Sequence, residues 1–326
     1  MKYFRQCSNI NVILNLNKMR KILKWIKRIF VAIFGLLLIV IFGLWVTFYF
    51  WKKEVINDLP KNSLVINTDR GEVEYTLSGN SDKYMLLVHG SPGSVYVEES
   101  KPFVDKGFTV LAISRPGYYK TPLTSGKTPK EQAALYESLL DELKIDSVYI
   151  NGVSGGGPSS IQFALDYPER TAGLILRAAV SEKYVEENTK KGLVNSFFET
   201  EFGTWLGIKI ALTQADDDIK KGINNYIKRG MFPRELSNEG YKNDMDQFGV
   251  LEDFPLEKIT TPTIIIHGDK DVDVPLSFAQ NASKRIPKAT LYKMEGKTHY
   301  VFFGSYGDTI NNEIVRFVDN IEAHKK

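Results

Sequence analysis

The sequence predicts an α/β domain with a mostly parallel sheet and helices on both faces, preceded by one transmembrane helix. Three observations support this fold class. Residues 29–51 form an uncharged apolar run. From residue 64 onward, short β-type runs alternate with amphipathic helical segments, which is the pattern of a parallel sheet covered by helices. Over about residues 180–255 the pattern is mainly helical, and an insertion of that length indicates a cap rather than a loop.

The apolar run at residues 29–51 is long enough to cross a membrane. It holds 23 residues without a charge. A helix of that length extends roughly 34 Å at about 1.5 Å per residue, whereas the hydrocarbon core of a bilayer is about 30 Å thick. Trp25 precedes the run and aromatic residues cluster at its far end, up to Trp51, which is typical of side chains at membrane interfaces. We therefore expect a transmembrane helix here and the lipid bilayer as a partner.

Positive charge is concentrated before this run. Residues 1–28 carry eight Lys or Arg and no Asp or Glu, and the rest of the chain carries 34 basic residues against 39 acidic ones. Basic flanks stay in the cytoplasm, so we expect a basic cytoplasmic segment at residues 1–28 and a single-pass anchor with the folded domain outside. A nucleic-acid binder would carry its basic patch on the folded domain, so no nucleic-acid partner is expected.

A cleaved signal peptide, which would leave a secreted domain, is the alternative to an uncleaved signal-anchor. Signal peptides have an apolar stretch of about 7–15 residues that ends in a site of small residues. The present run is longer, ends in bulky aromatic residues and is followed by Lys52 and Lys53, so the uncleaved anchor is favoured. Met19 is an alternative start of the chain.

A polar linker with Pro60 is expected at residues 52–63, and the α/β domain at residues 64–326. The first two predicted strands alternate in polarity, and the next two are continuous apolar runs, as in strands that are buried on both faces. The predicted strands are residues 63–67, 72–77, 83–90, 108–114, 148–151, 173–177, 263–267 and 290–294. The predicted helices are residues 130–143, 159–167 and 276–285, and a C-terminal helix with Ile310, Ile314, Phe317, Val318 and Ile321 on one face.

Cysteine and histidine are scarce. Cys7 is the single cysteine, which excludes an internal disulfide. Four histidines without an HExxH pattern supply few metal ligands. We expect neither a metal nor a cofactor.

The stretch INGVSGGGPSS at residues 150–160 places Ser154 among glycines, between a predicted strand and a predicted helix. A phosphate-binding loop would need the pattern GxxxxGK[ST], but residues 151–171 contain no lysine, and the glycine spacing does not fit GxGxxG. Gly152 to Gly156 do fit G-x-S-x-G, a sharp turn that presents a nucleophilic serine above the sheet. Small residues are needed two positions before and after that serine, and both are glycine.

A serine nucleophile requires a base to take its proton and a carboxylate to orient the base. The strand at residues 263–267 leads into GDKDVDVP, which holds Asp269, Asp271 and Asp273, and His299 follows the next strand. The carboxyl ends of parallel strands share one edge of the sheet. An oxyanion hole would use the N–H of Gly155 and one from the loop HGSPGS at residues 89–94, where Ser91 offers an N–H.

At this point the chain resembles the α/β-hydrolase fold family over about residues 64–321. The resemblance rests on HGSPG, SRPGY, GVSGG, HGDKDVDVP and GKTH, which occur in the order found in that family. It implies that Ser154, Asp271 and His299 are catalytic, that the N–H groups of Ser91 and Gly155 form the oxyanion hole, and that the helical block is the family's cap. His89 and His267 are then expected to be structural.

The resemblance implies a membrane-anchored serine hydrolase that cleaves a small-molecule carboxylic ester or acyl substrate through an acyl-enzyme. Epoxide hydrolases and haloalkane dehalogenases of this fold use an aspartate at the elbow, so the serine argues against both. Proline iminopeptidases are similar in the cap and the oxyanion loop, but their GGSWG and HGGPG differ from GVSGG and HGSPG. Such an exopeptidase, another amide or carbon–carbon hydrolase, and a non-catalytic binding module stay open as alternatives.

Overall fold

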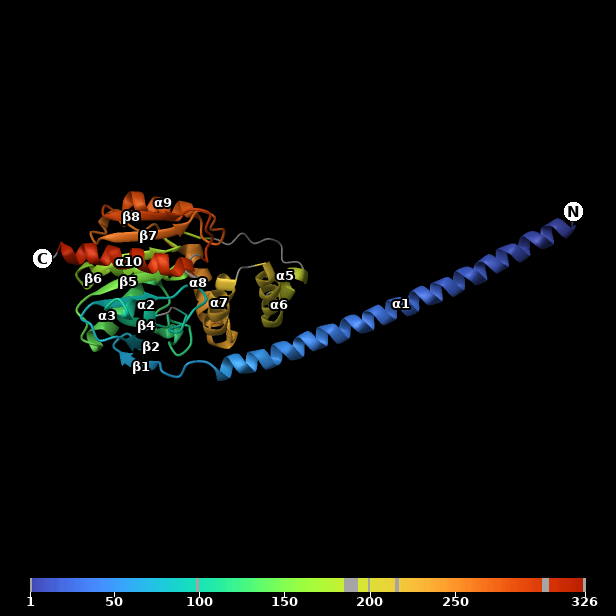
Figure 1. The fold of residues 1–326 in the computed structure, drawn as a ribbon, viewed down its shortest axis with the longest axis horizontal. Coiled ribbons are helices and arrows are strands. Elements are labelled where there is room, and N and C mark those ends of the chain that lie inside the picture. Colours follow the sequence, from blue (N-terminus) through green and yellow to red (C-terminus); the bar gives the residue numbers. More distant parts are fainter. Residues whose placement is uncertain are drawn as a thin grey trace. The chain divides into compact units, whose positions relative to one another are not determined.

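The computed structural model describes residues 2–97, 100–184, 193–198, 200–214, 217–300 and 305–324. The chain forms two compact units, Met1–Glu54 and Val55–Lys326. Figure 1 shows the long N-terminal helix and the α/β unit.

The N-terminal helix α1 spans Lys2–Asn57. Its Met19–Asn57 portion is long and apolar enough to cross a membrane. Large apolar side chains along it are exposed, among them Phe30 and Ile39, so this is not the core helix of a soluble protein. The finding fits a membrane anchor or a signal sequence.

The helix α1 continues beyond Trp51, so the first half of the expected linker is helical. Lys52, Lys53 and Glu54 have high helix propensity, so the helix continues through these charged residues. The chain leaves the helix just before Pro60, which disfavours helical geometry at the residue that precedes it. The non-helical connection is therefore confined to residues 58–63.

The second unit is built on one sheet of eight strands in the order β1-β2-β4-β3-β5-β6-β7-β8. The pairs β1–β2 and β2–β4 are antiparallel, and the other neighbouring pairs are parallel. This confirms the predicted fold class. The strands are β1 Leu64–Thr68, β2 Gly71–Ser78, β3 Tyr84–Val88, β4 Thr109–Ile113, β5 Val148–Val153, β6 Thr171–Arg177, β7 Thr263–Gly268 and β8 Ala289–Met294.

Helices cover both faces of this sheet (Figure 1). One apolar core includes Tyr136, Phe163 and Ala279, which come from α3, α4 and α9. The core on the other face joins Phe103 of α2 to the predicted apolar face of α10, whose Ile310, Ile314 and Val318 are buried. The helices are α2 Lys101–Val104, α3 Pro129–Glu142, α4 Gly157–Asp166, α9 Leu276–Arg285 and α10 Ser305–Ala323.

The insertion between β6 and β7 is helical, as the sequence predicts. Its described helices are α5 Leu193–Phe198, α6 Glu201–Ala211, α7 Asp217–Tyr226, the π-helix η5 Ile227–Met231 and α8 Asn238–Val250. The last of these packs on the α/β core, because Phe248 of α8 shares a buried apolar cluster with Val180, Val274 and Phe278. The cap is thereby held over the carboxyl edge of the sheet.

Candidate active site

Ser154 lies at a strained turn between β5 and α4. The strand β5 ends at Val153, and Ser154 itself has a φ of +49°. Residues other than glycine rarely adopt this left-handed conformation, which costs on the order of 1–3 kcal/mol and persists only where the surroundings enforce it. The N-terminus of α4 follows directly at Gly157. The geometry is that of the predicted nucleophile elbow.

Close packing around the elbow explains its glycines. A Cβ added at Gly156 would lie 2.5 Å from the Val88 carbonyl oxygen and 2.7 Å from that of His89. A Cβ at Gly155 would overlap Ser91 Oγ. The elbow therefore abuts the loop that follows β3, because β3 pairs with β5.

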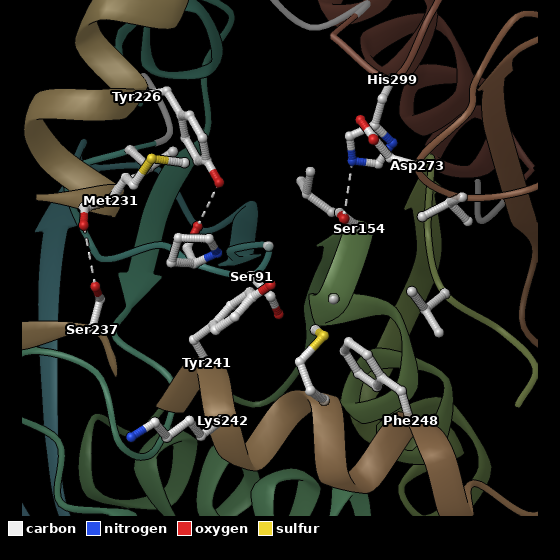
Figure 2. Close-up of a pocket in the computed structure, with 18 of the residues that line it drawn as sticks. Ser91, Ser154, Tyr226, Met231, Ser237, Tyr241, Lys242, Phe248, Asp273 and His299 are labelled. Atoms are coloured by element: carbon white, nitrogen blue, oxygen red, sulfur yellow. Dashed lines mark hydrogen bonds between the residues drawn. The ribbon is translucent and has the colours of Figure 1, made fainter. Parts of the chain in front are cut away.

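The three residues predicted to act together are hydrogen-bonded in one chain. Ser154 Oγ lies 3.0 Å from His299 Nε2, and His299 Nδ1 lies 2.8 Å from Asp271 Oδ2. Figure 2 shows the first of these contacts at the wall of a pocket. The carboxylate accepts from Nδ1, so Nδ1 carries the hydrogen and Nε2 is left to accept the hydroxyl proton of Ser154.

The other two aspartates of the loop take different places. Asp269 Oδ1 accepts a hydrogen bond of 2.6 Å from the Gly296 N–H and so links the turn after β7 to the turn after β8. Asp273 donates its own N–H to Asp271 Oδ1 at 2.9 Å, and its exposed side chain lines the pocket. Of the three, Asp271 alone bonds to His299 within the described chain.

His267 is a further partner of Asp271, and sequence reasoning gave it no role in the site. It is fully buried at the end of β7, with Nε2 3.0 Å from the Val274 carbonyl oxygen and 3.3 Å from Asp271 Oδ2. Both facing atoms are acceptors, so Nε2 carries the hydrogen. The only sequence feature that could have indicated this contact is the spacing of four residues between His267 and Asp271.

These contacts keep the Asp271 carboxylate ionised. Burial alone would raise its pKa, but hydrogen bonds from His267, His299 and the Val274 N–H outweigh burial and hold the pKa of Asp271 well below its usual range. A charged carboxylate at this place would offset the positive charge that a base at His299 acquires during the reaction.

The loop after β3 presents its backbone to the nucleophile. A Cβ at Gly90 would lie 3.1 Å from Ser154 Cβ, so the two segments are in contact. Among the backbone hydrogen bonds outside helices and strands in the described part of the chain, none is donated by the Ser91 N–H, and Gly155 directly follows Ser154 in the turn that leads into α4. Both residues therefore lie next to Ser154, where the predicted oxyanion hole would need them.

The site opens into a cavity of about 730 Å³ between the α/β core and the cap. Figure 2 shows Ser154 and His299 at one side of it and Ser237 and Lys242 of the cap at the other. The apolar lining residues are Val97, Val153, Val180, Tyr184, Phe198, Met231, Met245, Phe248 and Val274. The polar lining residues from the cap are Thr204, Tyr226, Arg234, Ser237, Asn238, Tyr241 and Lys242.

Among the described residues, one cluster has ligand atoms close enough together to hold a metal ion. Atoms of Asp271, Asp273 and His299 lie within 4.8 Å of one another. Both ring nitrogens of His299 are already hydrogen-bonded, one to Asp271 and one to Ser154. A metal ion would have to displace one of these contacts.

Comparison with known proteins agrees with this architecture. A sequence model described as alpha/beta hydrolase fold matches residues 83–306. The chain is 28% identical over 278 residues to the uncharacterized hydrolase YcgS of Bacillus subtilis (strain 168), covering 78% of this chain and 98% of that protein. It is 25% identical over 279 residues to a 2-hydroxy-6-oxononadienedioate/2-hydroxy-6-oxononatrienedioate hydrolase of a Pseudomonas species, covering 79% of this chain and 96% of the relative.

Solved structures give the same result. An alpha/beta hydrolase fold protein from Nakamurella multipartita superposes with a TM-score of 0.67 at 28% identity, covering 78% of this chain and 98% of the other. An esterase from Exiguobacterium antarcticum shares the fold with a TM-score of 0.60 at 19% identity, over 78% of this chain and 98% of its own. The family's sequence model matches more than half of this chain, and the chain therefore belongs to the α/β-hydrolase fold family.

Proposed function

We propose that the protein is a membrane-anchored serine hydrolase that cleaves carboxylic esters. The observation that carries this proposal is the hydrogen-bonded chain from Asp271 through His299 to Ser154, with distances of 2.8 and 3.0 Å. A nucleophile, a base and an orienting acid at these distances are the parts that acyl transfer needs. The relatives of the chain include a hydrolase, and an esterase shares its fold.

In the proposed reaction, Ser154 Oγ attacks the ester carbonyl carbon while His299 Nε2 takes the hydroxyl proton. Asp271 stabilises the resulting imidazolium. The N–H groups of Ser91 and Gly155 bind the negatively charged oxygen of the tetrahedral intermediate, and loss of one such donor typically costs about 10²–10³ in rate.

The intermediate then collapses to an acyl-enzyme. The proton on His299 passes to the leaving alkoxide, so that a neutral alcohol departs. His299 next accepts a proton from water, whose oxygen attacks the acyl-serine carbonyl. A second tetrahedral intermediate releases the carboxylic acid, and the proton returns to Ser154.

A carbon–carbon hydrolase is the second candidate. It is favoured by the similarity, over nearly their whole length, to relatives that act on a 2-hydroxy-6-oxo dienedioate. Such compounds carry carboxylates, and the cap supplies Arg234 and Lys242 to the lining of the pocket. The exopeptidase alternative would need an anion for the substrate's ammonium group, and Asp273 is the carboxylate at the pocket edge beside His299.

Three assays on the detergent-solubilised protein separate these candidates. The panel consists of p-nitrophenyl esters of increasing chain length, a 2-hydroxy-6-oxo dienoate and an aminoacyl-naphthylamide. We expect the esters to be hydrolysed fastest. Faster turnover of the dienoate or of the naphthylamide would replace the ester assignment.

The nucleophile is tested with Ser154→Ala. This variant should lose ester hydrolysis and labelling by a fluorophosphonate probe. The matched control is Ser277→Ala, at an exposed serine of α9, which should behave as wild type. Full activity in Ser154→Ala would refute the mechanism.

The membrane anchor and its orientation are part of the proposal. They are supported by the length and exposure of the apolar part of α1 and by the basic residues that precede it. A cysteine placed at the exposed Ser277 of α9 should react with a membrane-impermeant maleimide in intact cells, whereas Cys7 should react only after permeabilisation. The reverse pattern would reverse the topology, and recovery of the protein in the medium would favour a cleaved signal sequence.

A further inference from the structure

We infer that Asp244 of the cap and Arg115 of the core form a buried clamp that orients the oxyanion-hole N–H of Ser91. Both would be positioning residues, because they act through the loop rather than on the substrate. The inference rests on the proposed serine-hydrolase function and adds to it a requirement for the cap. In the sequence, Arg115 stands out only as part of the motif SRPGY, and no pattern indicates a role for Asp244.

Arg115 binds every residue of the segment His89–Ser91. Its side chain is fully buried, at 1% exposure. The Nε donates to the His89 carbonyl oxygen at 2.9 Å, and Nη2 donates to the Gly90 carbonyl oxygen at 3.2 Å and to Ser91 Oγ at 2.9 Å. The backbone N–H of Arg115 donates to His89 Nε2 at 2.9 Å.

The orientation of the Ser91 N–H follows from these contacts. The peptide between Gly90 and Ser91 is trans, and in a planar trans peptide the C=O and N–H bonds point in opposite directions. The Gly90 carbonyl oxygen is held by Arg115, so the Ser91 N–H must point away from Arg115. The preceding residue, Gly90, is where the loop meets Ser154, so a fixed peptide here sets which way the N–H faces beside the serine.

His89 supports the same peptide. Its Nε2 accepts from the Arg115 N–H, so Nδ1 carries the hydrogen and donates to the Gly90 carbonyl oxygen at 2.7 Å. Burial and the charge of Arg115 lower the pKa of His89 well below its usual value, which keeps the imidazole neutral and this tautomer in place. Two donors on one carbonyl, one of them cationic, also polarise the peptide and strengthen its N–H as a donor.

Asp244 supplies the negative charge that this arrangement needs. It lies in α8 of the cap and accepts hydrogen bonds from Arg115 Nη1 at 2.9 Å, from Arg115 Nη2 at 2.5 Å and from Tyr118 OH at 2.5 Å. Ser91 Oγ donates to the same carboxylate. Burial alone would lower the pKa of Arg115, but the Asp244 carboxylate raises it, so the guanidinium stays charged.

The clamp makes the oxyanion hole depend on the cap. Arg115 and the loop belong to the α/β core, whereas the counter-charge comes from a residue 129 positions later in the chain. A buried guanidinium without its carboxylate would be forced to move or to admit water. Either change would release the Gly90 carbonyl oxygen and loosen the Ser91 N–H.

The test is Asp244→Asn, with Asp246→Asn as the matched control. Asn keeps the size of Asp244 but removes its charge, and Asp246 is an exposed residue on the same helix. We expect kcat for a p-nitrophenyl ester to fall about 10²-fold with little change in KM, since a misplaced transition-state donor affects the rate by about that factor. Asp246→Asn should behave as wild type.

A transition-state analogue distinguishes positioning from a general structural defect. A trifluoromethyl ketone forms a hemiketal oxyanion on Ser154, so its affinity should fall in parallel with kcat/KM in Asp244→Asn. Unchanged kcat and analogue affinity in this variant would overturn the clamp, and so would a rise in KM alone. If Asp244→Asn does not fold, Arg115→Lys decides: a lysine keeps the positive charge but has one nitrogen in place of the two that hold the His89 and Gly90 carbonyl oxygens, and wild-type kcat and analogue affinity would overturn the inference. Full activity of Ser154→Ala would instead remove the proposed function itself.

Discussion

Replacing Asp271 with Asn should leave His299 in place but in the wrong tautomer. Asp271 Oδ1 accepts the N–H groups of Asp273 and Val274, each at 2.9 Å. Those two donors will select the amide oxygen of an Asn side chain. The amide NH₂ must then face His299 Nδ1, where Oδ2 now lies at 2.8 Å. An NH₂ group donates, so Nδ1 must become the acceptor and the hydrogen must move to Nε2.

That tautomer is inactive, because a protonated Nε2 cannot take the proton of Ser154 Oγ 3.0 Å away. The same change in a serine–histidine–aspartate triad lowers kcat by about 10⁴. At about 1.36 kcal/mol per factor of ten, this corresponds to roughly 5.4 kcal/mol of transition-state stabilisation. Binding of the substrate in the cavity should be almost unchanged, so KM should stay within about threefold.

The assay is initial-rate hydrolysis of a short p-nitrophenyl ester at neutral pH. Asp269→Asn serves as the control, because its amide oxygen can still accept the Gly296 N–H. We expect the control to keep most of its activity. If Asp271→Asn retained more than a tenth of wild-type kcat, or if Asp269→Asn showed the larger loss, the assigned acid would be wrong.

Three further predictions concern stability and the anchor. Gly156→Ala should lower the free energy of unfolding by about 1–3 kcal/mol, the usual cost of overpacking, because the new Cβ meets two backbone oxygens; a denaturant midpoint equal to wild type would contradict this. The pKa of Asp271 is lower in the folded protein than in the unfolded chain, so its ionised form stabilises the fold above the unfolded-state pKa of about 3.9, and this contribution is lost as pH falls towards the folded-state pKa. The difference in unfolding free energy between wild type and Asp271→Ala should therefore shrink below about pH 4. A difference that stays constant with pH in urea titrations would refute this. Removal of residues 1–57 should release the protein from membranes while kcat on a water-soluble ester stays within about twofold of the full-length value, and membrane retention in sedimentation would refute the anchor.

The fold was predictable, and so was the proximity of Ser154, Asp271 and His299, because their signals are local. Each strand and helix shows its periodicity over a few residues, and the elbow is one contiguous stretch of glycines around Ser154. Asp271 and His299 follow predicted strands, and the parallel topology brings strand ends together. The end of α1 was less predictable: the charged residues after Trp51 suggested a linker, but helix propensity carries the helix to Asn57.

The remaining parts of the site depend on contacts between distant segments. Nothing near Asp244 in the sequence marks it as the counter-charge of Arg115, because acidic residues are common on exposed helix faces. Its burial is decided by how α8 packs on the core. The contact of His267 with Asp271 could not be predicted for the same reason. No sequence pattern distinguishes a strand-end histidine with a purely structural role from one that binds Asp271.

The close packing of the elbow has a consequence for changing the substrate preference of this protein. Side chains cannot be added at Gly155 or Gly156 without collision, so directed evolution has almost no tolerated variation next to Ser154, the proposed nucleophile. Cap positions such as Tyr226, Met231 and Tyr241 line the same cavity without forming the elbow. A mutant library confined to the cap would explore new acyl and alcohol groups with the reaction centre held constant, whereas an equal library at the elbow would mostly yield chains that do not fold.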